Sequence, residues 1–246
     1  MSTPPGGPTT PQSTASGSSG AGARSVCPTA LEARSVYRFF RGGGQETLAL
    51  QGVSLEVAAG ELVVVAGPSG SGKSTLLACL AGLDEPDGGT VRVAGEALSG
   101  RPETVRTALR ARHIGLLLQS ANLIEHLSVE QNLALVQHLV DRAVRANRGV
   151  LLAAVGLAGR PGAYPSQLSG GEAARAGLAV ALANEPAVLL ADEPTGELDS
   201  TTETQVLDLL RGTAERGTAV LVASHSPAVA AAADRVLHLV DGALSS

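Results

Sequence analysis

The residues best suited to chemistry begin with a glycine-rich stretch at positions 67–75, which lies between apolar runs at 62–66 and 76–81. Glycines at this spacing let the backbone wrap closely around phosphate groups, so that successive N–H groups point at phosphate oxygens. A helix that begins there adds the positive end of its dipole. In order, the stretch reads Gly67, Pro68, Ser69, Gly70, Ser71, Gly72, Lys73, Ser74 and Thr75. It predicts a phosphate-binding loop between a strand and a helix.

Two side chains of this loop have specific expected roles. Lys73 would reach the β- and γ-phosphates as a compact cation, and the Ser74 hydroxyl would take one coordination position on Mg²⁺. Lys73 is the only lysine among the 18 basic residues of the chain. A guanidinium fork cannot replace an ammonium in such a loop. By spacing alone, Thr75 is an ordinary helix residue, and a glycine-rich turn that merely caps a helix is the alternative interpretation.

Four further polar residues follow apolar runs that are typical of buried strands. Asp192 would hold Mg²⁺ through its water shell, and Glu193 would orient or deprotonate an attacking water molecule. Gln119 could join the shell of metal and water, and His225 could contact the γ-phosphate. The alternatives are a helix-capping acid pair, a surface glutamine and a histidine with ordinary structural partners.

The elements that must position these residues alternate between strand and helix, which predicts an α/β fold with a mainly parallel sheet and helices on both faces. Apolar positions between residues 128 and 157 recur at helical spacing and predict an inserted helical subdomain at approximately residues 120–168. Ser169 resembles the N-cap of the next helix. Strands are expected at residues 31–40, 48–57, 62–66, 90–94, 114–118, 187–191, 219–222 and 236–240, and helices at 76–81, 101–112, 169–183 and 200–211.

Composition limits the class of protein. The chain has 246 residues, of which 44% are hydrophobic and 17% charged, enough for one large α/β domain with a sizeable core. A net charge of −5 and scattered arginines disfavour a nucleic-acid partner. Cys27 and Cys79 have no metal-ligand spacing and are not expected to pair, which fits a reducing cytoplasm.

The sequence offers neither a membrane span nor a signal peptide. No run reaches the roughly 18 apolar residues that a transmembrane helix needs. Residues 2–23 contain only Ser, Thr, Pro, Gly, Gln and Ala, so they lack the basic and apolar regions of a signal peptide. We expect a disordered tail at residues 1–29 and a folded domain at residues 30–246.

In this order the motifs resemble the ATP-binding subunit of ABC transporters, over residues 31–244. The segment Leu168-Ser169-Gly170-Gly171-Glu172 is similar to that family's signature motif, which separates it from other phosphate-loop proteins. Residues 191–200 and 82–84 are similar to the lipoprotein-release, macrolide-export and FtsE-like branch. The resemblance therefore implies the phosphate-loop ATPase core of this family, with an antiparallel β portion beside the parallel sheet.

The resemblance also implies site residues. It makes residues 67–75, Thr75 included, the phosphate loop, and Phe40 the aromatic that stacks on adenine, with Tyr37 as the alternative ring. The remaining assignments are Gln119 as the Q-loop, Asp192 and Glu193 as the second Walker motif, Asp199 as the D-loop and His225 as the switch. Two positions depart from the family pattern without removing a phosphate ligand: Val180 stands where arginine is usual, and Ser226 where aspartate is frequent.

The family implies a mechanism with two subunits. Two ATP molecules, with Mg²⁺, would lie between the ATPase subunits of a homodimer, and Ser169, Gly170 and Gly171 of one subunit would face the phosphate loop of the other. ATP would close the pair, and hydrolysis would release it. The motion would reach separate membrane permease subunits, FtsX-like or similar, docked on the helical subdomain near Gln119. The protein would then be cytoplasmic and peripheral on the inner face of the membrane, serving export or extrusion.

Two other functions compete with this interpretation. A soluble ABC-like ATPase of DNA maintenance is disfavoured because the short spacing between Lys73 and Ser169 leaves no room for long coiled coils, and a translation factor would carry two cassettes. A non-hydrolytic scaffold is disfavoured because Glu193 and His225 are both present. Lipoprotein, peptide and drug substrates, and a role in cell-wall regulation, are all compatible with the sequence.

Overall fold

The computed structural model describes residues 1–3, 28–42, 45–119, 122–140 and 146–245. Most of the tail expected at residues 1–29 lies outside these ranges, so it stays a prediction.

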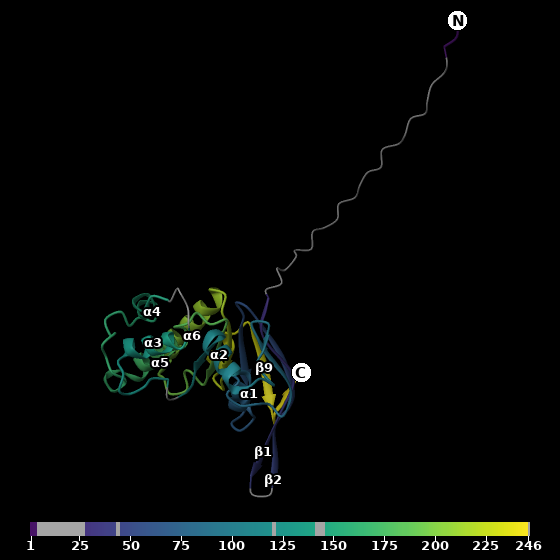
Figure 1. Cartoon of the computed structure of the whole chain (residues 1–246). Coiled ribbons are helices and arrows are strands. Elements are labelled where there is room, and N and C mark those ends of the chain that lie inside the picture. The colour runs from purple at the N-terminus through teal and green to yellow at the C-terminus, as the bar shows by residue number, and fades with distance from the viewer. Residues whose placement is uncertain (4–27, 43–44, 120–121, 141–145, 246) are drawn as a thin grey trace.

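A six-stranded sheet forms the centre of the molecule (Figure 1). Its strand order is β10-β9-β3-β8-β7-β6, parallel throughout except for the antiparallel edge strand β10. Parallel pairing brings the carboxyl ends of β3, β7 and β8 to one edge of the sheet, where ligands bind in open α/β sheets. The strands are β3 (Leu62–Ala66), β6 (Ile114–Leu117), β7 (Val188–Asp192), β8 (Ala219–Ala223), β9 (Arg235–Val240) and β10 (Ala243–Ser245).

A four-stranded antiparallel sheet lies beside the first, in the order β2-β1-β4-β5. Its strands are β1 (Thr29–Gly42), β2 (Gln45–Ala58), β4 (Gly88–Val93) and β5 (Glu96–Ala97). β1 and β2 pair along almost their whole length, and the end of this hairpin projects beyond the body of the molecule (Figure 1). The antiparallel β portion predicted from the sequence is confirmed.

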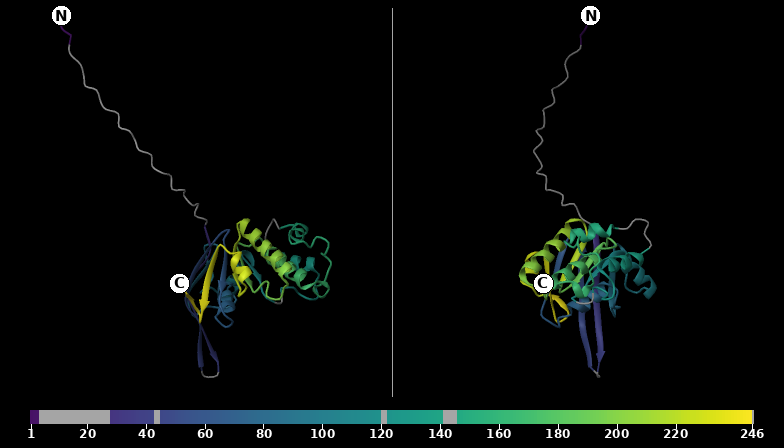
Figure 2. Two further views of the ribbon diagram at one scale, coloured as in Figure 1. Left: turned by 180° about the vertical axis from the view of Figure 1, so that it is seen from behind. Right: turned by 90° about the vertical axis from the view of Figure 1, so that its left-hand side faces the viewer.

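Seven α-helices and one 3-10 helix complete the described part of the chain. Helices α3, α4 and α5 gather at the side of the molecule away from the β1–β2 hairpin (Figures 1 and 2). They are α1 (Lys73–Leu80), α2 (Glu103–His113), α3 (Val129–His138), α4 (Arg148–Ala154), the 3-10 helix (Pro165–Gln167), α5 (Gly170–Ala181), α6 (Ser200–Glu215) and α7 (Pro227–Ala231). Within the described ranges, no helix combines the length and apolar character needed to cross a membrane.

The central sheet is buried on both faces because its side chains alternate between two layers. Val63 and Val65 of β3 pack with α1 and the antiparallel sheet, whereas Leu62 and Val64 pack with α5 and α6. A strand covered on both faces must be apolar at every position, which is why β3, β7 and β8 are continuous apolar runs. The α/β class with a mainly parallel sheet is confirmed.

A third cluster holds the helical region together. It joins Leu133 of α3, Leu152 of α4 and Ala176 of α5. Helix α5 lies beyond residue 168, so the packing of the helical region continues past the end predicted for the subdomain. The division into residues 1–29, 30–246 and a subdomain at 120–168 stays a prediction.

The sequence missed the two shortest strands, β5 and β10. The signal for β10 was present, because Asp241-Gly242 separates it from β9 and both residues have positive φ, 48° and 78°. Two consecutive residues of this kind form the type I′ turn of a tight hairpin. Helix α6 also runs to Glu215, four residues past its predicted end at 211, because Leu210 and Ala214 pack under the sheet.

Burial makes Cys79 a test of the packing around α1. The residue is 1% exposed, and burial raises the pKa of its thiol to about 12. At about pH 8 only about one thiol in 10⁴ would be ionised, and the thiolate is the reactive form. In a Cys27→Ser variant, the native protein should resist iodoacetamide, and denaturation should expose one reactive thiol by mass spectrometry. Rapid labelling of the native variant would contradict this packing.

Candidate active site

The glycine-rich loop joins β3 to α1 and passes closely between two other segments. A Cβ atom at Gly67 would lie 2.1 Å from the carbonyl oxygen of Leu239, and one at Gly72 would lie 2.6 Å from that of Ala49. Gly72 also has a φ of 103°, a conformation that L side chains rarely adopt. No side chain caps the first turn of α1, so its N–H groups are left for an external acceptor such as phosphate.

Lys73 lies across this loop. Its side chain is almost buried, and Nζ donates hydrogen bonds to the carbonyl oxygens of Gly67, at 2.9 Å, and Pro68, at 3.1 Å. An ammonium has three donors, so one remains for an acceptor in the cleft. Within the described part of the chain, the loop thus holds its cation in place by its own backbone carbonyls.

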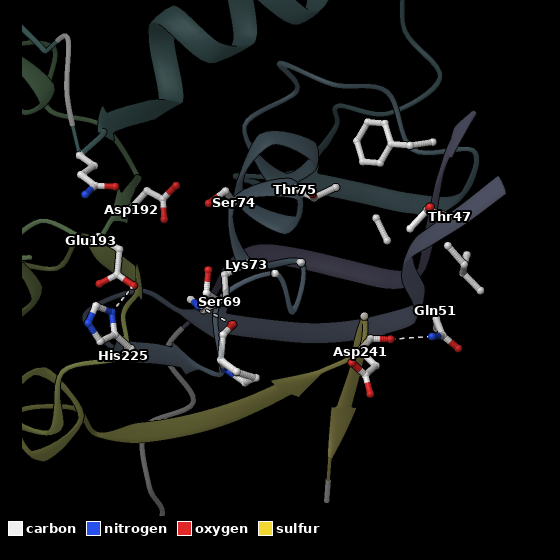
Figure 3. A pocket seen from close by; sticks show the side chains of 18 residues that line it. Thr47, Gln51, Ser69, Lys73, Ser74, Thr75, Asp192, Glu193, His225 and Asp241 are labelled. Atoms are coloured by element: carbon white, nitrogen blue, oxygen red, sulfur yellow. Dashed lines mark hydrogen bonds and ion pairs between the residues drawn. The ribbon is translucent and has the colours of Figure 1, made fainter. Parts of the chain in front are cut away.

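Asp192 and Glu193 lie where β7 ends, facing the loop (Figure 3). Glu193 has a φ of 45°, which is uncommon for a residue with a side chain, and its N–H donates to the carbonyl oxygen of Ala223 at 2.9 Å. This bond links the end of β7 to the end of β8. It fixes the direction in which the Glu193 carboxylate leaves the sheet.

Both oxygens of the Glu193 carboxylate have partners. His225 Nδ1 lies 2.8 Å from Oε1 and, because an ionised carboxylate only accepts, must carry the proton of this bond (Figure 3). The Ser224 hydroxyl donates to Oε2 at 2.9 Å. The two oxygens offer about four lone pairs, so capacity remains to accept a bond from water. Ser224 was not predicted as a site residue, although its position directly before His225 indicated that it lies near the predicted site.

These side chains line a cleft of about 870 Å³, within the range of small-molecule sites. The predicted site residues that the structure brings together there are Phe40, Pro68, Ser69, Gly70, Gly72, Lys73, Ser74, Thr75, Gln119, Asp192, Glu193 and His225. The sequence did not predict part of the cleft wall, because neither β2 nor the β9–β10 turn matches a nucleotide-binding motif. The missed residues are Thr47, Leu48, Ala49, Gln51, Asp241 and Gly242.

The structure separates the candidate aromatic rings. Phe40 lines the cleft, and the Arg38 guanidinium lies 4.9 Å from the centre of its ring. Hydrogen bonds from Arg38 to Asp87 and Asp84 hold that guanidinium and raise the pKa of Arg38.

The other two rings lie elsewhere. Phe39 borders a separate hollow together with Arg38, Phe40 and Asp87. The Tyr37 ring lies against Gly52 and Gly88. The geometry therefore favours Phe40 as the ring available to a base in the cleft.

Six other predicted residues are not among those lining the cleft. Of these, Gly67 and Ser71 belong to the loop itself. Ser169 caps α5: its hydroxyl accepts from the Glu172 N–H at 3.2 Å, and the Glu172 carboxylate accepts from the Ser169 N–H at 2.9 Å. The latter bond is the main cause of the lowered pKa of Glu172. With Ser169, its neighbours Gly170 and Gly171 also lie outside the cleft.

Asp199, the last of these six residues, caps α6. Its carboxylate accepts from the Thr202 hydroxyl at 2.7 Å and from the Thr201 and Thr202 N–H groups at 3.0 and 3.1 Å. These bonds, with the hydroxyl of Thr202 first, lower the pKa of Asp199. In a single chain, therefore, the caps Ser169 and Asp199 both lie outside the cleft that contains the phosphate loop.

The donor set of the cleft fits Mg²⁺. Oδ1 of Asp192 is buried without a hydrogen-bond partner in the structure, a state that buried carboxylate oxygens rarely keep unless they serve a ligand. Ser74 and Gln119 line the same cleft and add oxygen donors. No cluster of three or more His, Cys, Asp or Glu side chains suited to a metal occurs in the described ranges. Magnesium bound through few protein ligands, water and phosphate does not require one.

Known proteins resemble this chain over most of its length. The family model for ABC transporters matches residues 50–196. The macrolide export ATP-binding/permease protein MacB of Shigella flexneri is 41% identical over 215 residues, which are 86% of this chain and 33% of MacB. The lipoprotein-releasing system ATP-binding protein LolD of Chromohalobacter salexigens is 40% identical over 219 residues, which are 87% of this chain and 92% of LolD. The chain thus spans about a third of the length of its MacB relatives.

Solved structures agree with these relatives. The dimeric structure of the bacterial ABC transporter cassette MJ0796 has a TM-score of 0.81 at 33% identity, covering 88% of this chain and 97% of that one. The same cassette in a dimeric post-hydrolysis state bound to ADP and Pi matches equally well.

The contacts of Lys73 generate a binding prediction. Lys73→Ala should weaken ATP binding at least tenfold, about 1.4 kcal/mol, because no other lysine can replace it. Lys73→Arg should also bind poorly, since a planar fork cannot fit between the Gly67 and Pro68 carbonyls. Isothermal titration calorimetry measures both affinities, and thermal unfolding controls for folding. Parental affinity in the arginine variant would refute the need for an ammonium.

The positions of the two phenylalanines generate a second prediction. Phe40→Ala should weaken ATP binding about two- to tenfold, the range expected from loss of an aromatic stacking contact. Phe39→Ala is the matched control, since it removes a neighbouring exposed ring that is not among the residues lining the cleft. Titration with a fluorescent ATP analogue compares the two variants. Equal losses in both would argue against Phe40 as the adenine contact.

Proposed function

The chain belongs to the ABC transporter family, and on that premise we propose that it is the ATP-hydrolysing subunit of a transport complex whose membrane-spanning part is a separate chain. One observation carries the proposal: Glu193, held by His225 and Ser224, shares a cleft with the Lys73 loop. A phosphate cradle alone would serve binding. A positioned carboxylate beside it serves hydrolysis.

Each side of the cleft would hold one part of the nucleotide. The first-turn N–H groups of α1 and the free donor of Lys73 would bind the β- and γ-phosphates, and Phe40 would stack on the base. Ser74, Asp192 and Gln119 would hold Mg²⁺. When bound, the ion supplies positive charge that offsets the charge developing on the phosphate oxygens.

Glu193 would act as the general base. Its carboxylate retains lone pairs beyond those used by His225 and Ser224, so it can accept a hydrogen bond from the attacking water and orient it. His225 is largely exposed. With Nδ1 engaged by Glu193, its Nε2 atom would be the one that senses the γ-phosphate. Base and sensor would thus be coupled through one hydrogen bond.

A second subunit would complete the site. Gly170 is exposed and a Cβ atom there would meet nothing within 4 Å, so the start of α5 is open to a phosphate from another molecule. The capping box uses the Glu172 N–H and leaves the earlier N–H groups of α5 free. The dimeric state of MJ0796 supports a homodimer in which Ser169, Gly170 and Gly171 face the partner's nucleotide.

The membrane partner would dock on the helical region. Large apolar side chains are exposed there and beside Gln119: Leu118, Ile124, Leu135, Leu139 and Val150. The match along 92% of LolD, named as an ATP-binding protein of a lipoprotein-releasing system, supports a permease on another chain. The names of LolD and MacB, release and export, favour transport away from the cytoplasm. Both names also favour transport over the soluble alternative. The protein would lie at the inner face of the membrane through this partner.

Glu193→Gln tests the base and the two-subunit site together. The amide keeps the shape of the side chain but cannot take a proton, while Asp192 and Lys73 still bind magnesium-ATP. Hydrolysis should fall at least a hundredfold, as for loss of a general base. The closed state should then accumulate as a dimer by light scattering, with magnesium-ATP and not with ADP.

Adding Ser169→Arg to this variant should abolish the dimer, because a bulky cation would block the start of α5 without touching the phosphate loop of the same chain. Ser128→Ala controls for the loss of a cap, since Ser128 makes an equivalent capping box at α3. A Glu193→Gln protein that hydrolyses ATP at the parental rate would refute the base assignment. A dimer that persists with Ser169→Arg would refute the proposed interface.

A further inference from the structure

A carboxylate outside the cleft joins two loops of the proposed active site. Glu203 lies in the first turn of α6, and its Oε1 atom accepts two hydrogen bonds. The Ser226 hydroxyl donates to it at 2.8 Å, and the Thr195 hydroxyl donates to it at 3.1 Å. Thr195 follows Asp192 and Glu193 at the end of β7, whereas Ser226 follows His225 at the end of β8. One oxygen atom thus bridges the two loops.

The bridge continues to the proposed base. The Ser226 N–H donates to the Ser224 hydroxyl oxygen at 3.1 Å, and the Ser224 hydroxyl donates to Glu193 Oε2 at 2.9 Å. Ser224 and Thr195 are almost fully buried, at 1% and 4% exposure. A path of contacts therefore runs from Glu193 through the buried Ser224 and the half-buried Ser226 to Glu203, and its buried part is where such hydrogen bonds are stronger.

Ser226 gives up a local role to make this contact. It occupies the N-cap of α7, where a serine hydroxyl ordinarily accepts a bond from the helix backbone, yet it makes no such bond. The hydroxyl donates to Glu203 instead. The Ser226 side chain does not make the bond that its N-cap position favours and instead bonds to Glu203, which is far away in the sequence. This preference points to a requirement of the site.

We propose that Glu203 is a positioning residue for ATP hydrolysis. It holds the His225 loop in a fixed position relative to the loop from Thr195 to Asp199. His225 has little other restraint, because its exposed ring is bonded to Glu193 alone among the contacts found in the described ranges. Asp199 ends the second loop and caps α6 through Thr202, and the Thr202 side chain lies against Gly171 of the proposed interface. Glu203 thereby links the proposed base and sensor to the dimer interface. This inference rests on the proposed function.

A purely local role for Glu203 predicts something different. An acid in the first turn of a helix interacts favourably with the helix dipole. Loss of that interaction would lower stability slightly and would not affect turnover at saturating ATP. A positioning role predicts the reverse: a fall in kcat with little change in KM or in the unfolding midpoint.

The geometry offers a rescue that only the positioning role permits. An aspartate at position 226 would place a carboxylate oxygen one bond further along the direction in which the Ser226 hydroxyl reaches Glu203. With alanine at position 203, that oxygen would extend into the space vacated by Oε1, toward the Thr195 hydroxyl. In the parental background the same aspartate would face Glu203, and the two like charges would repel each other.

The experiment compares Glu203→Ala, Ser226→Asp and their combination in the full chain, with Asp208→Ala as the control. Asp208 is exposed on the same helix, so its loss removes one charge from α6 without touching either loop. Steady-state kinetics with magnesium-ATP should give an approximately tenfold lower kcat for each single variant, with KM within about twofold. The combination should recover most of the parental kcat, and Asp208→Ala should match the parent.

Two results would overturn the inference alone: a parental kcat in Glu203→Ala, or a double variant no faster than Glu203→Ala when the parent hydrolyses ATP. A drop in the unfolding midpoint of Glu203→Ala that matches its loss of kcat, without rescue, would assign a merely structural role. A parental chain without ATPase activity would overturn the proposed function, and this inference with it.

Discussion

The parallel register of β3, β7 and β8 is the constraint on which the site depends. It places three strand ends side by side, and the backbone continues the pairing past the strands. The Glu193 N–H donates to the Ala223 carbonyl, and the Ser224 N–H donates to the Val65 carbonyl. Because these bonds reach into the loops, Glu193, the proposed base, and its hydroxyl partner Ser224 are fixed by backbone geometry. The phosphate loop begins at the end of β3, so this loop, the proposed base and the proposed sensor share one edge.

Close backbone contacts impose the second constraint. Gly67 passes Leu239 and Gly72 passes Ala49 at distances that exclude any side chain. The loop is therefore held between the β9 end and β2, and its shape does not depend on a ligand. Lys73 folds back on the carbonyls of the same loop. The cradle is preorganised, which lowers the cost of ordering it when phosphate binds.

The polar groups of the site hydrogen-bond to one another, which offsets the cost of removing the buried ones, such as Ser224 and Thr195, from water. Glu193 is satisfied by His225 and Ser224, and Ser226 and Thr195 are satisfied by Glu203. By contrast, Oδ1 of Asp192 is buried without a hydrogen-bond partner in the described part of the chain, and the caps at Ser169 and Asp199 lie outside the cleft. The proposed function assigns a magnesium ion to the Asp192 oxygen and a second subunit to the two helix caps.

The sequence by itself determined the phosphate loop, the order of strands and helices apart from β5 and β10, and the pairing of Asp192 with Glu193 at a strand end. These are local properties. The glycine spacing indicates where the backbone can adopt the conformation of a phosphate loop, and continuous apolar runs indicate which strands are covered on both faces. Only the tertiary structure decided which distant segments meet. The Gln51 side chain donates to the Asp241 carbonyl in one wall of the cleft, Phe40 rather than Tyr37 lines the cleft, and Glu203 accepts from Ser226. Periodicity shows that a residue is buried or exposed but not what it faces, so contacts between loops far apart in the chain carry no signal in a single sequence.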